Sequence, residues 1–133
     1  MRILIVDDDF TSRKILQKML AQYGSVDVAT DGEEGVAAFH SALKEGEAYD
    51  LITMDIIMPN MDGQKCLQEI RQIEKERGVD PKDAVKVIMV SGLSNNEALH
   101  DAFFLGAATS YITKPISKEV LLNEMSSLGL VLS

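Results

Sequence analysis

The chain has 133 residues, 46% of them hydrophobic and 26% charged, which is typical of one globular domain and leads us to expect a single domain over residues 1–133. Its formal charge of −8, from 13 basic and 21 acidic residues, argues against direct binding to nucleic acid, because that requires a concentrated basic surface. The single cysteine, Cys66, excludes an internal disulfide and favours a reducing compartment, and no apolar run approaches a membrane span, so we expect a cytoplasmic protein.

Short β-branched runs alternate along the chain with segments whose apolar residues have helical spacing. The runs predict strands at residues 2–6, 26–29, 51–54, 85–90 and 110–112. The helical stripes between and after these strands begin at Ile15, Val36, Leu67, Leu99 and Val120. Asp31 or Thr30 suits the start of the second helix, and Gly78 suits the end of the third. We expect the charged residues 74–83 to form a surface loop.

Five repeats of strand and helix predict an α/β fold, with a five-stranded parallel sheet and helices on both faces. The first, third and fourth strands are apolar on both sides, as is typical of central strands. Functional sites in such sheets lie at the carboxyl ends of the strands. The polar residues that follow the strands are therefore the candidates, and they are Asp7, Asp8, Asp9, Asp55, Ser91 and Lys114.

These candidates form a chemically coherent set if they converge. The carboxylates of Asp7, Asp8 and Asp55 would repel one another, and a divalent cation with oxygen ligands, such as Mg²⁺, would relieve that repulsion. Lys114 suits one phosphoryl oxygen, and the Ser91 hydroxyl can donate to another. A carboxylate beside Mg²⁺ and a lysine is a competent nucleophile towards phosphorus, so the set predicts a labile phosphate on aspartate. Asp9, like Asp62 further on, is best interpreted as a helix cap or a turn residue.

The motifs resemble those of the receiver domains of bacterial response regulators, in particular the chemotaxis-type single-domain regulators, over essentially the whole chain. The segments that carry the resemblance are residues 6–9 (VDDD), 54–63 (MDIIMPNMDG), 91–92 (SG), 106–107 (GA) and 111–115 (YITKP). The resemblance implies a flavodoxin-like, doubly wound fold with strand order 2-1-3-4-5. It also implies a cis peptide bond before Pro115.

The resemblance assigns a chemical role to each residue of the site. Asp55 would take the phosphoryl group from a phosphohistidine on a sensor histidine kinase or a phosphotransfer domain. Mg²⁺ would be bound by Asp8, Asp55 and the main-chain carbonyl of Ile57, with Asp7 acting mostly through water, while Lys114 would bind the phosphoryl group. The chain would then be a signalling phosphoprotein of a two-component pathway. It would catalyse only its own phosphorylation and dephosphorylation and would not be an enzyme for other substrates.

A switch is implied as well. Ser91 would move towards the phosphoryl group, and Tyr111 would turn from solvent into the space that Ser91 leaves. The face formed by the fourth helix, the fifth strand and the fifth helix would change shape and bind a downstream protein. The apolar residues Ile57 and Leu93 border the path of the hydrolytic water in this family, so we predict slow self-dephosphorylation.

Two alternatives were weighed against this interpretation. Residues 7–11 (DDDFT) also fit the Asp-x-Asp-x-Thr signature of haloacid-dehalogenase-type phosphatases, with Asp7 as nucleophile. That family needs a further acidic motif after the lysine, for which Glu119 is a poor candidate, and it leaves the loop after Asp55 unexplained. A degenerate receiver that only binds partners would lack an acidic residue, the acceptor or the lysine, and none is missing. The sequence is compatible with a chemotaxis target and with a phosphorelay shuttle.

Overall fold

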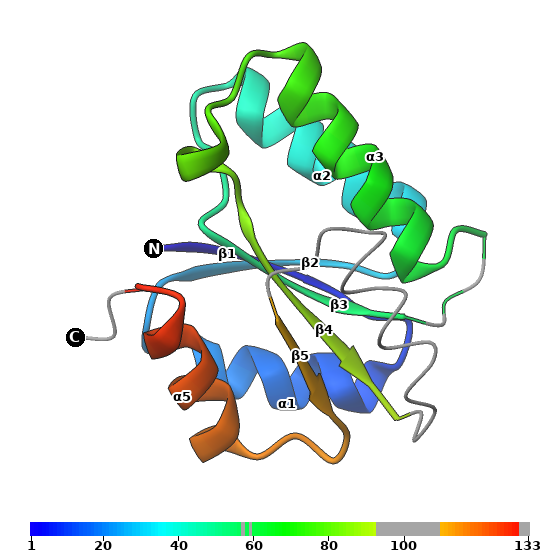
Figure 1. Ribbon diagram of the computed structural model, residues 1–133. Helices are drawn as coiled ribbons and strands as arrows, with labels where there is room; N and C mark the ends of the chain where they lie inside the picture. Colours follow the sequence, from blue (N-terminus) through cyan, green and yellow to red (C-terminus); the bar gives the residue numbers. More distant parts are fainter. Residues whose placement is uncertain (57, 59, 93–109, 131–133) are drawn as a thin grey trace.

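A parallel five-stranded sheet forms the centre of the protein (Figure 1). The computed structural model describes residues 1–56, 58, 60–92 and 110–130, and for Ser91 it describes the backbone. The strands are β1 (Arg2–Val6), β2 (Ser25–Ala29), β3 (Leu51–Asp55), β4 (Lys86–Ser91) and β5 (Ser110–Thr113). Their order, β2-β1-β3-β4-β5, confirms the one that the resemblance implied, and each observed bound lies within one residue of the predicted one.

Helices cover both faces of the sheet (Figure 1). On one face lie α1 (Phe10–Leu20) and α5 (Lys118–Ser127), and on the other lie α2 (Gly32–Lys44) and α3 (Gly63–Glu76). The helix expected around Leu99 lies outside the described residues. In the described part of the chain, no helix is long and apolar enough to cross a bilayer.

Each of these four helices begins at a polar cap. The cap side chain accepts a hydrogen bond from a backbone N–H three residues further on, which satisfies one of the free donors of the first turn. The caps are Asp9, Asp31, Asp62 and Ser117. At the other end of α3, Gly78 takes a φ of 71°, a left-handed conformation that favours glycine, so the predicted end of this helix is confirmed.

Side-chain alternation along the strands divides the core into two layers. In β1, Ile3 and Ile5 pack with the apolar residues of α1 and α5, whereas Leu4 and Val6 pack with those of α2 and α3. All four side chains are fully buried, and burial of each stabilises the fold by about 1.5–3 kcal/mol. The alternation also fixes the strand register, because a shift by one residue would exchange the two layers.

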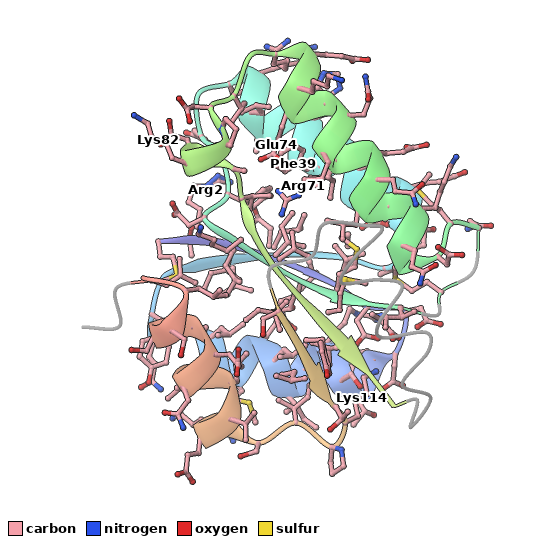
Figure 2. All side chains as sticks on the ribbon, viewed as in Figure 1. Arg2, Phe39, Arg71, Glu74, Lys82 and Lys114 are labelled. Atoms are coloured by element: carbon pink, nitrogen blue, oxygen red, sulfur yellow. The ribbon has the colours of Figure 1, made fainter. Side chains whose placement is uncertain are left out.

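The expectation of a surface loop over residues 74–83 is wrong at two places. Glu74 lies inside α3 and is only 6% exposed, and Pro81–Asp83 forms a short 3-10 helix, η1. Glu74 accepts a hydrogen bond of 2.8 Å from the N–H of Val85, and Arg71 donates both to Glu74 (2.7 Å) and to the carbonyl of Val85 (2.9 Å) (Figure 2). The carboxylate is buried because the backbone just before β4 needs an acceptor there.

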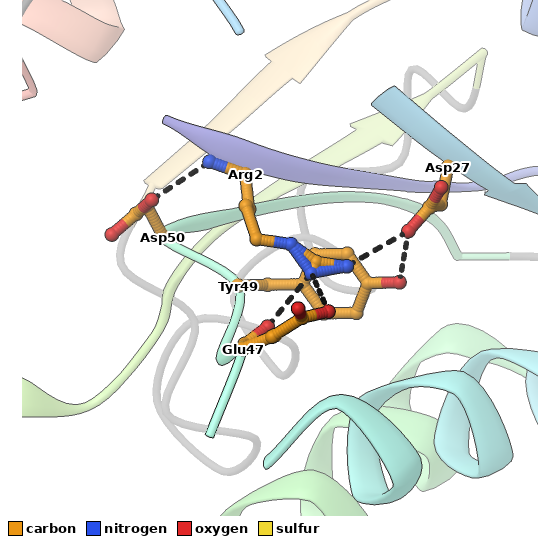
Figure 3. A network of polar contacts seen from close by, with 5 residues as sticks. All are labelled: Arg2, Asp27, Glu47, Tyr49 and Asp50. Carbon is orange, nitrogen blue, oxygen red and sulfur yellow. Dashed lines mark hydrogen bonds and ion pairs between the residues drawn. The ribbon is translucent and has the colours of Figure 1, made fainter. Parts of the chain in front are cut away.

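A second polar group, the amino-end network, ties the segment before β3 to β1 and β2 (Figure 3). The backbone N–H of Arg2 donates to Asp50 (2.8 Å), and its guanidinium donates to the carbonyl of Glu47 (2.8 Å) and to Asp27 (3.2 Å). The guanidinium also lies 4.7 Å from the ring centre of Tyr49, whose hydroxyl donates to Asp27 at 2.6 Å. Burial, together with this hydrogen bond to Asp27, raises the pKa of Tyr49 to about 12.

Candidate functional site

Three of the predicted site residues lie together at the carboxyl ends of strands β1, β3 and β5. Asp7 follows β1, Asp55 is the last residue of β3, and Lys114 follows β5, where Figure 2 labels it. Asp55 pairs in register with Val90, which belongs to the core layer beneath α1 and α5. The fold therefore assembles groups that are far apart in the sequence, as expected for a parallel sheet.

Lys114 is ion-paired with two carboxylates at once. Its Nζ lies 3.2 Å from Oδ2 of Asp7 and 3.6 Å from Oδ2 of Asp55. The Asp7 side chain is 1% exposed, that of Asp55 is 11% exposed and that of Lys114 is 22% exposed. Burial alone would lower the pKa of Lys114, but the charges of Asp55 and Asp7 outweigh it and hold that pKa above the ordinary value of 10.5. Lys114 is thus a permanent cation in the site.

Asp8 completes an acidic cluster that suits a divalent cation. Carboxylate oxygens of Asp7, Asp8 and Asp55 lie within 4.8 Å of one another, and Asp8 is exposed, so the cluster opens towards solvent at that residue. Three carboxylates and one ammonium group give these four side chains a net formal charge of −2. An all-oxygen donor set of this charge fits Mg²⁺, which binds a few carboxylates and keeps further positions for water or phosphate.

The loop after β1 is held in place by its own backbone and by Arg13. The N–H of Asp9 donates to Oδ1 of Asp7 at 2.9 Å, and the Arg13 guanidinium donates to the carbonyl of Asp7 at 2.9 Å. Asp9 accepts from the hydroxyl (2.7 Å) and the N–H (2.9 Å) of Ser12, and these hydrogen bonds lower the pKa of Asp9. Of the two interpretations predicted for Asp9, helix cap or turn residue, the structure shows the helix cap. The contribution of Arg13 was missed, although it lies one helical turn from the acidic loop.

The start of α3 lies against the end of β3. The N–H of Gly63 donates to the carbonyl of Ile56 at 2.7 Å. A Cβ atom on Gly63 would lie 2.2 Å from the carbonyl oxygen of Asp55, so only glycine lets α3 start this close to the site. Asp62 caps α3 by accepting from the N–H of Lys65, which is one of the two roles predicted for it. Ile57, the predicted carbonyl ligand, lies outside the described residues, as does Leu93.

The predicted switch residues lie on neighbouring strands. Tyr111, on β5, is 46% exposed, which is the outward position that the resemblance implied. In register, Ser91 of β4 pairs with Thr113 of β5, next to Lys114. The Ser91 side chain lies outside the description, so its predicted hydrogen bond remains a prediction. The peptide bond between Lys114 and Pro115 is cis, which confirms the expectation for Pro115.

Comparison with known proteins gives consistent results. A family model described as the response regulator receiver domain matches residues 3–126. Chemotaxis protein CheY of Treponema pallidum is 37% identical over 128 residues, which cover 95% of this chain and 81% of that protein. Chemotaxis protein CheY of Bacillus subtilis is 34% identical over 125 residues, which cover 94% of both chains.

Among solved structures, a chain in the crystal structure of the CheX–CheY–BeF3–Mg²⁺ complex from Borrelia burgdorferi is similar, with a TM-score of 0.82 and 29% identity. The match covers 98% of this chain and 90% of that one. The comparisons give no support to the alternative in which Asp7 is the nucleophile of a phosphatase.

Proposed function

The chain belongs to the response regulator receiver domain family and is a receiver of phosphorelay signalling, and from this premise we propose that Asp55 is its phosphoryl acceptor. The observation that carries the proposal is the Lys114 ammonium group, 3.6 Å from Asp55 at the edge of the acidic cluster. Asp7 also contacts Lys114, but it is 1% exposed and its Oδ1 is occupied by the N–H of Asp9. Asp55 combines contact with the lysine and partial exposure, which a nucleophile needs.

The proposed reaction is a direct transfer. A carboxylate oxygen of Asp55 attacks the phosphorus of a phosphohistidine on a sensor histidine kinase or a phosphotransfer domain. The new O–P bond forms as the N–P bond breaks, and the electron pair of that bond stays on the imidazole, which takes up a proton from solvent. Lys114 stabilises the negative charge on a phosphoryl oxygen, because its ammonium group already lies beside the acceptor. The chain thereby catalyses its own phosphorylation, and we propose no turnover of an external substrate.

Asp8 and Asp55 would hold Mg²⁺, together with the main-chain carbonyl of Ile57, and Asp7 would act through water. When bound, Mg²⁺ supplies charge neutralisation for the phosphoryl oxygens. The net formal charge of −2 that the three carboxylates and Lys114 carry together supports this assignment. The similarity to a chain in a CheX–CheY–BeF3–Mg²⁺ complex supports it independently.

We also propose where the signal leaves the protein. Tyr111 on β5 and Val120 on α5 are 46% and 47% exposed, so this side of the molecule presents large apolar groups to solvent. A downstream protein would bind the face formed by the fourth helix, β5 and α5, with Ser91 and Tyr111 as the switch. The extent of a single domain over residues 1–133 and a cytoplasmic location remain predictions, the latter supported by the unbridged, buried Cys66.

The test is to incubate the purified chain with acetyl phosphate, with and without Mg²⁺, and to measure its intact mass. We expect one phosphoryl adduct that requires Mg²⁺ and is lost in Asp55→Asn. Asp80→Asn makes the same chemical change at an exposed helix cap and should keep the adduct. An adduct that survives Asp55→Asn would contradict the proposal. Phosphatase turnover that survives Asp55→Asn and is lost in Asp7→Asn would favour the alternative nucleophile.

A further inference from the structure

The turn between β2 and α2 is in contact with the segment that follows Asp55. Oδ2 of Asp31 accepts a hydrogen bond of 3.1 Å from the side-chain amide of Asn60. Oδ1 of the same carboxylate accepts from the N–H of Glu34 at 2.8 Å and so caps α2. One side chain therefore joins the start of α2 to the loop beyond Asp55, 29 residues further along the chain.

Backbone packing and a thiol strengthen this junction. A Cβ atom on Gly32 would lie 2.3 Å from the carbonyl oxygen of Met61, so the two backbones touch with no side chain between them. The thiol of Cys66, which is fully buried, donates to the carbonyl of Gly32 at 3.4 Å. Burial raises the pKa of Cys66 to about 12, so the thiol keeps the proton that it donates. Three contacts thus fix residues 60–66 to the turn.

The same segment is fixed to the acceptor strand on its other side. Gly63 donates to the carbonyl of Ile56, and its Cα lies directly against the carbonyl of Asp55. Asn60, which makes the contact with Asp31, has a φ of 68°, a left-handed conformation that asparagine adopts more readily than most residues. A displacement of residues 60–63 away from the turn would therefore be transmitted to the backbone of Asp55.

We infer that Asp31 and Asn60 are positioning residues for the phosphoryl-transfer site. Their hydrogen bond holds residues 60–63 against the backbone of Ile56 and Asp55, and so keeps the Asp55 carboxylate in place for Mg²⁺ binding. The inference rests on the proposed function of Asp55 and extends it to a residue pair that contacts no reacting group. It predicts a defect in cation affinity, whereas a purely structural contact would change only the stability of the fold.

The decisive variant is Asn60→Asp. It removes the donor and places a second carboxylate opposite Asp31, so the contact becomes repulsive. The reciprocal variant Asp31→Asn/Asn60→Asp restores a donor–acceptor pair with its direction reversed. Asparagine caps helices as well as aspartate does, and aspartate also tolerates the left-handed conformation, so neither backbone position is compromised. The double variant has the net charge of the wild type.

Asn123→Asp is the matched control. It makes the same substitution at an exposed position of α5. Near the site, an added negative charge by itself would strengthen cation binding, because unlike charges attract. A weakening in Asn60→Asp therefore reports the geometry of the loop and not its charge.

Mg²⁺ alone is titrated into each variant by calorimetry, and adduct formation from acetyl phosphate is timed over a range of Mg²⁺ concentrations. For Asn60→Asp we expect affinity about three- to tenfold weaker, the size expected for one lost hydrogen bond. The Mg²⁺ affinity of the double variant should return to within about twofold of the wild-type affinity, and that of Asn123→Asp should equal the wild-type affinity. Melting temperatures measured alongside identify any variant that does not fold.

A folded Asn60→Asp variant that binds Mg²⁺ with the affinity of the wild type would overturn the inference. A double variant as defective as the single one would overturn it too, because the defect would not then depend on the pairing. Failure of the wild type to form an Mg²⁺-dependent adduct would instead refute the proposed function of Asp55. The two failures are therefore distinguishable.

Discussion

The two ends of the sheet carry similar sets of charged residues, which differ in burial and in the donors that surround them. Each end has a network in which one cationic residue lies with three carboxylates. At the amino end, Arg2 contacts Asp27 and Glu47 through its guanidinium and Asp50 through its backbone N–H, and at the carboxyl end Lys114 lies with Asp7, Asp8 and Asp55. Charge composition alone therefore does not distinguish the candidate site from a purely structural network.

Burial and the supply of donors make the difference. The side chains of Asp27 and Glu47 are 54% and 65% exposed, so water shares in their solvation, and the forked guanidinium of Arg2 serves several acceptors at once. The site carboxylates Asp7 and Asp55 are nearly buried and share one compact ammonium group. Water and the guanidinium thus share in stabilising the carboxylates of the amino end, whereas the carboxylates of the carboxyl end lie within 4.8 Å of one another, an arrangement that favours a bound cation.

Replacing the lysine at the carboxyl end should have the largest effect. In Lys114→Met we expect adduct formation from acetyl phosphate to slow by about a hundredfold or more, because the phosphoryl charge loses its fixed partner. Without Mg²⁺, the free energy of unfolding should fall by about 2 kcal/mol, less than for a fully buried pair because Lys114 is partly exposed. Intact mass against time and urea unfolding measure the two effects.

Mg²⁺ should stabilise Lys114→Met more than it stabilises the wild type, because the variant loses the ammonium group that offsets part of the negative charge of the three carboxylates. Lys118→Met, at an exposed lysine of α5, is the control and should change neither the rate of adduct formation nor the free energy of unfolding. Equal stabilisation of Lys114→Met and wild type by Mg²⁺ would show that the lysine and the cation do not share the same carboxylates.

At the amino end, Glu74→Ala should damage stability and leave the chemistry intact. The substitution leaves the N–H of Val85 and the guanidinium of Arg71 without this acceptor, and we expect a loss of about 3 kcal/mol in urea unfolding. Adduct formation per folded molecule should equal that of the wild type. Glu76→Ala, at an exposed position of the same helix, is the control. A matching loss of adduct rate would remove the distinction between the two ends.

The pH dependence of stability should report the charge of Lys114 at the carboxyl end. The folded-state pKa of Lys114 lies above its ordinary value of 10.5, so Lys114 stabilises the fold fully below that value and loses its effect as the pH rises through the folded-state pKa. The difference in unfolding free energy between wild type and Lys114→Met should stay constant from neutral pH to about 10 and then narrow. A difference that vanishes near neutral pH would contradict the charge pairing in the site.

The smallest effect is expected for Tyr49→Phe. The substitution removes the hydroxyl that donates to Asp27 and keeps the ring against which the Arg2 guanidinium lies. We expect a loss of about 1 kcal/mol in unfolding free energy and an unchanged adduct rate. Tyr23→Phe, at a half-buried tyrosine before β2, is the matched control. A larger loss would mean that the hydroxyl, and not the stacked ring, holds Arg2 in place.

Sequence patterns were sufficient to predict those features of the fold and the site that depend on residues close together in the chain. The β-branched runs located all five strands, and the residues after three of them supplied Asp7, Asp8, Asp55 and Lys114, which the fold brings together. Glu74 was missed because it stands in a charged run with the exposed Lys75, and its partner Val85 is 11 residues away. A pairing over such a distance has no periodicity to reveal it and depends on how helix and strand meet.

The contact between Asp31 and Asn60 was missed for a related reason. Each residue has a sufficient local explanation, one as a helix cap and the other as a turn residue. Their hydrogen bond exists because two loops at the same end of the sheet lie side by side. Local roles can therefore conceal a tertiary one.

The position of Lys114 has a consequence for how the protein is made. The strand before it, β5, lies at one edge of the sheet and is synthesised after the other described strands, whereas Asp7 follows the first. A nascent chain that has emerged only as far as β4 carries the carboxylates without the lysine that belongs beside them. The cluster of Asp7, Asp55 and Lys114 therefore cannot form before β5 has been synthesised and has joined the sheet.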